Sequence, residues 1–188
     1  MKKSLGAKTL LFPTPVMIVA TFDKAGKPNA AAVAWGGICG SKPPCVNISL
    51  REATYSFGNI LERKAFTVNI PGEKFIKEAD YFGLVSGRDQ DKFKKTGLTA
   101  VKSPLVDAPY IEEFPLVLEC SLLKSVNIGL HTIFVGEVKD VKADAAVLDA
   151  QGVPDIAKIA PMSFNPATRT YYATGKFLAQ AFSVGARD

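Results

Sequence analysis

Short apolar runs alternate with turn residues over the first quarter of the chain. Val16–Phe22 is a continuous run of apolar and β-branched residues, as expected for a buried strand. The segment Asp23–Pro28 has turn composition, and Asn29–Trp35 then predicts a second strand, so the two strands form a hairpin. Residues 36–44 are rich in glycine and proline and predict a loop, followed by a third strand at Cys45–Leu50.

Helical and strand patterns then follow each other. Thr54 is a candidate N-cap for a helix whose inward face carries Phe57, Ile60 and Leu61. Residues 65–70 predict a fourth strand, and residues 74–86 an amphipathic helix.

Two long strands are predicted at 114–126 and 132–141, and a shorter one near 170–172. Six or more mostly antiparallel strands with a few helices indicate an α+β, mainly β protein with a closed barrel. We expect residues 1–188 to form a single domain.

The second predicted strand carries unusually small side chains. Ala30, Ala31, Ala32 and Ala34 contribute little packing area of their own, so another group is expected to approach this strand closely. A flat ligand ring and a packed helix are both compatible with this pattern.

Composition excludes several classes of site. Lys and Arg number 23 against 18 Asp and Glu, a net charge of +5, but the basic residues are scattered and form no stripe of the nucleic-acid-binding kind. Cys39, Cys45 and Cys120 include no C-x-x-C pair, and there is one histidine. A disulfide framework or a metal cluster is therefore not expected, and the thiols are expected to be buried.

The N-terminal region gives no sign of a membrane segment. Pro13 and Pro15 interrupt the apolar stretch that begins at Leu10, and Val16–Ala20 is too short to span a bilayer. We therefore expect a cytoplasmic protein that does not associate with membranes.

The joint between the third strand and the following helix is a candidate anion site. A helix N-terminus offers unpaired N–H groups, Arg51 adds a fork of donors, and Thr54 and Ser56 add hydroxyls. Lys92 could reach the same anion. The spacing alone favours the alternative, an ordinary strand–helix joint and a solvated lysine.

Two ring side chains are further candidates. His131 begins a predicted strand and could polarise a ligand carbonyl or relay a proton, and Trp35 could stack on a ring. A surface histidine and a core tryptophan are the alternatives that the pattern leaves open.

Three segments together carry a family resemblance. They are TPVMIVATFDKAGKPNAAAVAWGGICGSKPPCVNISLREATYSFGNI at 14–60, DKF at 91–93 and HTIFVGEV at 131–138. Their order resembles the flavin reductase-like family, the FMN-binding split barrels, and within it the flavoredoxin group. The resemblance implies a Greek-key split barrel that forms a homodimer and holds FMN non-covalently near the dimer interface.

The resemblance also implies roles for individual residues. The isoalloxazine or ribityl part of FMN would be lined by Asn29, Trp35, Gly36 and Gly37. Ser49, Leu50 and Arg51 would follow the ribityl chain and phosphate, and Thr54, Tyr55 and Ser56 would complete the phosphate site. Lys92 would be a basic contact, His131 would lie at the reactive side of the ring as the catalytic candidate, and Phe164 would cover the ring.

The function implied is electron transfer through FMN, either as an oxidoreductase or as a carrier between redox partner proteins. The alternative is a flavin reductase in which NADH or NADPH reduces the flavin directly. A non-catalytic barrel that binds single-stranded nucleic acid is a distant alternative. It would need aromatic residues interleaved with basic ones, whereas the strand at 29–35 is almost entirely small and apolar.

Overall fold

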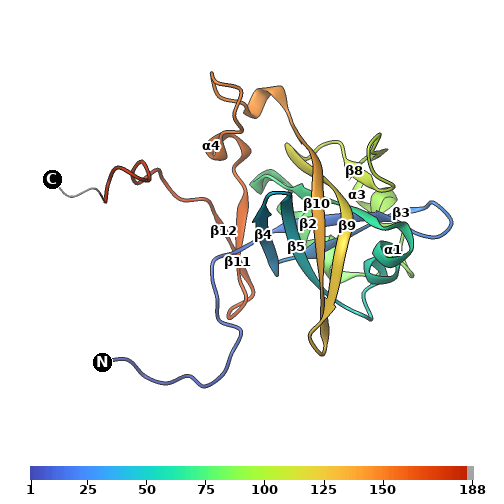
Figure 1. The fold of residues 1–188 in the computed structure, drawn as a ribbon, viewed down its shortest axis with the longest axis horizontal. Coiled ribbons are helices and arrows are strands. Elements are labelled where there is room, and N and C mark those ends of the chain that lie inside the picture. Colours follow the sequence, from blue (N-terminus) through green and yellow to red (C-terminus); the bar gives the residue numbers. More distant parts are fainter. Residues whose placement is uncertain (186–188) are drawn as a thin grey trace.

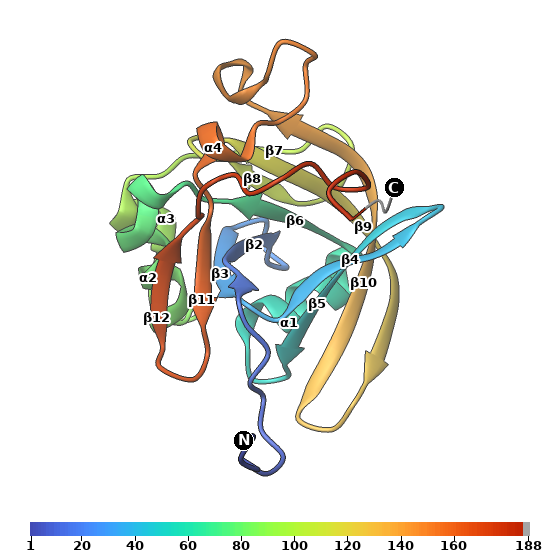
Figure 2. The same cartoon turned by 90° about the vertical axis from the view of Figure 1, so that its left-hand side faces the viewer.

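A seven-stranded antiparallel sheet forms the body of the computed structural model, which describes residues 1–185. The strand order is β3-β2-β6-β9-β10-β5-β4. The strands are β2 (Met17–Phe22), β3 (Pro28–Val33), β4 (Gly36–Ser41), β5 (Pro44–Arg51), β6 (Ala65–Ile70), β9 (Leu116–Asn127) and β10 (His131–Ala143). The sheet curls so that β3, at one edge, comes back toward β5, which makes a barrel (Figure 2).

The barrel interior is filled by large apolar side chains. Phe66, Phe134 and Ile48 are completely buried there. A Cβ atom at Gly136 would lie 2.5 Å from Cζ of Phe66, so the phenyl ring occupies the space that any other residue on β10 would need. This close packing fixes the strands that carry the site described below.

Short helices cover the outside of the barrel (Figure 1). They are α1 (Tyr55–Arg63), α2 (Ile76–Leu84), α3 (Lys92–Thr96) and α4 (Ile156–Ile159), with 3₁₀ turns η1 (Glu73–Phe75) and η2 (Ala145–Val147). In α1, Ile60 is buried in the core and Phe57 and Leu61 pack against it, as the helical spacing predicted. In α2, Gly83 lies close to Ala32 of β3, so a helix does pack against the strand of small residues.

Two small sheets complete the fold. One contains β1 (Thr14–Pro15), β11 (Met162–Asn165) and β12 (Thr170–Ala173), and the other β7 (Ala100–Lys102) and β8 (Pro109–Ile111). The segments 1–12 and 176–185 extend away from the barrel (Figure 1). Within residues 1–185, no helix has the length and apolar character needed to cross a bilayer.

Three sequence-based predictions were wrong in detail. The expected loop at 36–44 contains strand β4, because glycines are tolerated on the edge strand of a sheet. The helix predicted at 74–86 ends at Leu84, which leaves residues 85–87 as a loop. Cys39 is exposed on β4, whereas Cys45 and Cys120 are buried as expected.

Candidate functional site

A groove runs along β3 and connects three adjoining cavities. The first cavity has a volume of about 240 Å³, the second about 220 Å³ and the third about 160 Å³. Ala32 and Thr54 border both the first and the second cavity, and Ala32, Val33 and Ala34 border both the second and the third. The small side chains of β3 therefore form the common floor of the groove, in addition to packing against α2.

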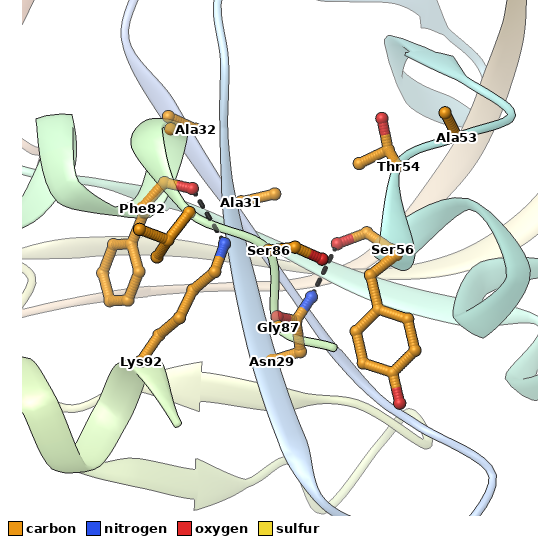
Figure 3. A pocket seen from close by; sticks show the side chains of 13 residues that line it. Asn29, Ala31, Ala32, Ala53, Thr54, Ser56, Phe82, Ser86, Gly87 and Lys92 are labelled. Atoms are coloured by element: carbon orange, nitrogen blue, oxygen red, sulfur yellow. Dashed lines mark hydrogen bonds between the residues drawn. The ribbon is translucent and has the colours of Figure 1, made fainter. Parts of the chain in front are cut away.

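The first cavity lies between two walls (Figure 3). One wall is the joint between β5 and α1, residues 53–56, and the other is the loop 85–87 after α2. Asn29 and Ala31 of β3 also line the cavity, as does Lys92 at the start of α3, whose amine points toward Phe82 (Figure 3). Backbone turns, hydroxyls and one amine thus surround a cavity large enough for a small ligand group.

Among the residues that the structure describes, no carboxylate pairs with the buried Lys92 amine. Its side chain is 4% exposed, and Nζ donates hydrogen bonds to the carbonyl oxygens of Ala30 at 2.7 Å and Phe82 at 2.9 Å. The adjacent Asp91 carboxylate instead caps α3 by accepting from the Lys94 amide and faces Lys27. Burial lowers the pKa of the Lys92 amine from 10.5 to about 8, because the charged form has lost its hydration. An anion in this cavity would stabilise the charged form of the Lys92 amine.

The N-terminus of α1 opens onto the same cavity. Thr54 occupies the N-cap position with extended backbone, but its side chain makes no capping hydrogen bond. The first amide hydrogens of a helix have no acceptor within the helix, and they carry the positive end of its dipole. Thr54 therefore leaves both its hydroxyl and the first turn of α1 available to a ligand, and it is not the ordinary side-chain cap that the spacing alone favoured.

A buried amide–hydroxyl pair supports these two groups. The Asn29 amide nitrogen donates to Oγ of Ser56 at 2.9 Å, and both residues are buried (Figure 3). The Asn29 amide oxygen is also buried and has no protein partner. A Cβ atom at Gly87 would lie 2.0 Å from this oxygen, so the loop 85–87 lies directly against Asn29.

The second cavity is lined by aromatic and basic groups. The rings of Trp35 and His131 lie 4.8 Å apart at an angle of 39°. Arg51 pairs with His131 across the β5–β10 ladder and is exposed. Trp35 is 39% exposed and is therefore not a core residue. This end of the groove offers aromatic surface that solvent and other molecules can reach.

Phe164 of β11 and Tyr171 of β12 line the third cavity together with Val16. Their rings are 5.4 Å apart. The Tyr171 hydroxyl donates to Oδ1 of Asp80 on α2 at 2.8 Å, so the hairpin is tied to the helix beside the groove. Burial and the nearby Asp80 carboxylate raise the pKa of Tyr171 to about 12, which keeps this hydroxyl a donor.

The structure brings most of the predicted site residues to the groove. Asn29, Thr54, Tyr55, Ser56 and Lys92 line the first cavity. Trp35, Ser49, Leu50, Arg51, His131 and again Thr54 line the second, and Phe164 lines the third.

Two predicted residues lie elsewhere. Gly36 and Gly37 belong to β4 and line none of the three cavities. A Cβ atom at Gly36 would lie 2.3 Å from the carbonyl oxygen of Asn47, so that glycine permits close contact between β4 and β5. Arg51 borders the cavity that contains Trp35 and His131 rather than the one that contains Lys92.

Sequence reasoning missed the loop 85–87 and Tyr171. The predicted helix at 74–86 included most of this loop, although the Ser-Gly pair at 86–87 is turn chemistry that would have ended the helix earlier. Tyr171 was assigned only to a short strand, and nothing in the sequence connects it to Asp80, which lies 91 residues away.

Comparison with known proteins agrees with this geometry. The sequence model of the flavin reductase like domain matches residues 9–173. The flavoredoxin of Desulfovibrio vulgaris (Miyazaki F) is 50% identical and superposes with a TM-score of 0.95 over 99% of this chain and 100% of its own. A flavoredoxin from Methanosarcina acetivorans is 28% identical, with a TM-score of 0.91 over 98% of each chain.

A more distant solved structure agrees on the fold. It is described as a flavin reductase with a split barrel domain from Shewanella frigidimarina, and it is 22% identical with a TM-score of 0.81 over 90% of this chain and 86% of its own. The mainly β split barrel expected from the sequence is thereby confirmed. Because the family match covers most of the chain and the groove lies within it, this protein belongs to the flavin reductase-like family.

Proposed function

We propose that the protein is an FMN flavoprotein that transfers electrons, and that the first cavity holds the FMN phosphate. The observation that carries the proposal is the buried Lys92 amine, which has no carboxylate partner within residues 1–185 and lines the same cavity as the N-terminus of α1. A phosphomonoester is a dianion with several acceptor oxygens, and this donor set matches it. The high similarity to a solved flavoredoxin supports the same assignment.

The remaining groove suits the rest of the cofactor. The ribityl chain would pass Thr54 and Ser49, and the flat ring would lie in the second and third cavities, over the alanines of β3 and near Trp35, His131 and Phe164. FMN supplies the one- and two-electron chemistry when bound, and the protein supplies binding, orientation and charge. His131 and Arg51 place hydrogen-bond donors beside the ring end, where they would stabilise negative charge on a reduced flavin.

Two electron sources fit the exposed ring end. A protein partner could dock over Trp35 and Arg51, as the similarity to flavoredoxins favours, or NADH or NADPH could reach the same surface. Adding NADH or NADPH to the anaerobic yellow protein distinguishes them. Rapid bleaching at 450 nm indicates direct hydride transfer, whereas a stable yellow colour that only a reduced protein donor removes indicates a carrier.

The chain carries exposed apolar groups that suit a second copy of itself. Leu11, Phe12, Phe177 and Leu178 on the extended ends are more than half exposed, as are Ile38 on β4 and Leu123, Ile128 and Leu130 on or beside the β9–β10 hairpin. Exposed apolar side chains that gather in one region often mark contacts between proteins, so the proposal includes a homodimer. Analytical ultracentrifugation at micromolar concentration is expected to give a dimer, and a monomer would contradict it.

The free thiols agree with a cytoplasmic location, which the proposal also includes, because Cys39, Cys45 and Cys120 form no disulfide.

The cofactor assignment itself is tested by adding FMN to the purified apoprotein and following quenching of flavin fluorescence. Saturable binding at micromolar FMN or below, weakened in Lys92→Met but not in Lys94→Ala, is the expected result. If Lys92→Met and Lys94→Ala bind FMN with equal affinity, the assignment of the FMN phosphate to the first cavity is wrong.

A further inference from the structure

The two walls of the first cavity are tied together by one side chain. Arg88, directly after the loop 85–87, donates from Nη1 to the carbonyl oxygen of Ala53 at 2.8 Å. Its guanidinium group lies over the Tyr55 ring at 5.1 Å. Ala53 and Tyr55 belong to the opposite wall, so Arg88 forms a bridge from the loop after α2 to the joint before α1.

Both ends of this bridge are held in place. On its own side, the Arg88 amide donates to Oγ of Ser86, and the Ser86 carbonyl accepts from the amides of Asp89 and Gln90, which makes a tight turn. On the far side, the Tyr55 hydroxyl donates to Oδ2 of Asp23 at 2.9 Å. The aromatic surface beneath Arg88 is therefore fixed by the β2–β3 turn, which contains Asp23.

On its inner side, the loop 85–87 packs tightly against neighbouring side chains. Gly87 lies against the buried amide oxygen of Asn29, where an added Cβ would come within 2.0 Å, and against Tyr55, where it would come within 2.9 Å of Cδ1. The loop 85–87 thus contacts Asn29 on the inside and is bridged by Arg88 on the outside. Both contacts hold the loop that forms one wall of the first cavity.

We propose that the Arg88 bridge makes the first cavity selective for a terminal phosphate monoester and excludes flavin dinucleotides. A monoester ends inside the cavity, whereas the phosphate of FAD continues into a second phosphate and an adenosine that must leave between the two walls. Because Arg88 and the loop it anchors join the two walls, they would obstruct that path. This inference rests on the proposed placement of the FMN phosphate beside Lys92.

The test is a comparison of FMN and FAD binding to the full-length wild type, Arg88→Ala and Arg88→Lys. Lys94→Ala serves as control, because it removes another exposed cation near Lys92 without touching the bridge. We expect wild type to prefer FMN, and Arg88→Ala to lower the FMN-to-FAD preference by about tenfold or more, mainly through tighter FAD binding. Arg88→Lys keeps the charge and a single donor and is expected to fall between the two, while Lys94→Ala behaves as wild type.

The other outcomes are distinguishable. If Arg88→Ala weakens FMN and FAD equally, Arg88 contributes charge rather than selectivity, and the inference is wrong. If wild type binds FMN and FAD with equal affinity, the inference is again wrong, although the proposed function stands. If wild type binds no FMN while circular dichroism shows it to be folded, the proposed function fails and the inference fails with it.

Discussion

The two ends of the groove differ in burial and in the kind of group they present. At the first cavity Asn29, Ser56 and Lys92 are all buried, and hydrogen bonds fix their positions. At the second cavity Trp35 and Arg51 are exposed, and the contact between the Trp35 and His131 rings is the main interaction. The first cavity is buried and polar, and the second is open and aromatic.

This difference indicates that the first cavity binds the ligand and the second is where electrons are exchanged. A charge in a buried site interacts strongly with its ligand because water does not screen it, which suits a permanent anchor. Aromatic surface at an open end offers area for a ring while leaving room for a donor or acceptor to approach. The comparison predicts that substitutions at the first cavity change affinity and stability, whereas substitutions at the second change the rate of electron exchange.

The largest expected effect is on FMN affinity in Lys92→Met. Removing the charge while keeping the aliphatic stem should weaken FMN binding about 100-fold, the cost of a lost charge-assisted hydrogen bond in a buried site. His131→Ala should change the same affinity by less than about threefold. Fluorescence titration of both variants measures this contrast, and equal losses at the two ends would refute it.

Ser56→Ala tests the support of the anchor. The substitution leaves the buried Asn29 amide nitrogen without its acceptor, in addition to an oxygen that already has no protein partner. We expect the apoprotein to lose about 2 kcal/mol of unfolding free energy, the usual cost of such a group. Ser49→Ala, at the second cavity, is the matched control and should cost less than about 0.5 kcal/mol in urea denaturation. Similar losses of unfolding free energy in Ser56→Ala and Ser49→Ala would contradict the difference between the first and second cavities.

The pH dependence of FMN binding follows from the Lys92 pKa of about 8 in the free protein. Below that pH the amine is already charged, so affinity should be constant down to about pH 6, where the phosphate itself gains a proton. Above pH 8 binding must take up a proton, and affinity should fall by up to about tenfold per pH unit. Titrations from pH 6 to pH 10 measure the profile, and Lys92→Met should lack the decline above pH 8.

The same shift affects the stability of the apoprotein with the opposite trend. The folded pKa lies below the unfolded value of 10.5, so the unfolded chain binds more protons between about pH 8 and 10.5. The destabilisation caused by charged Lys92 is therefore complete below pH 8 and disappears as the pH rises toward 10.5. Lys92→Met should remove this rise in stability from urea denaturation curves measured across the same pH range.

The smallest expected effect is that of Tyr171→Phe. The ring that lines the third cavity stays, and only the hydrogen bond to Asp80 is lost. We expect a loss of about 1 kcal/mol in unfolding free energy and an FMN affinity within about twofold of wild type. A tenfold loss of FMN affinity would show that the third cavity also contributes to FMN binding, which would contradict the assignment to the first cavity.

The elements that carry the site were largely predictable from sequence because their patterns are local. The apolar run at 16–22, the helical spacing of Phe57, Ile60 and Leu61, and the small residues of β3 each indicated the element that the structure contains. The strand β4 was missed because its glycines read as a loop, and only pairing with β5 at the sheet edge makes them a strand.

The state of the site residues depended on contacts that no local pattern encodes. Lys92 stands in a charged segment and reads as solvated, yet α2 and β3 bring two carbonyl groups to its amine and bury it. The bridge from Arg88 to Ala53 likewise joins residues 35 positions apart. Such groups become recognisable as a site only once the barrel has closed.

The central claim is that the first cavity binds a phosphate through Lys92, and the most direct measurement compares FMN with riboflavin, which lacks the phosphate. Wild type should bind FMN at least about 100-fold more tightly than riboflavin, and in Lys92→Met this ratio should shrink to about tenfold or less while riboflavin affinity stays the same. An FMN-to-riboflavin ratio that is identical in wild type and Lys92→Met would contradict the account.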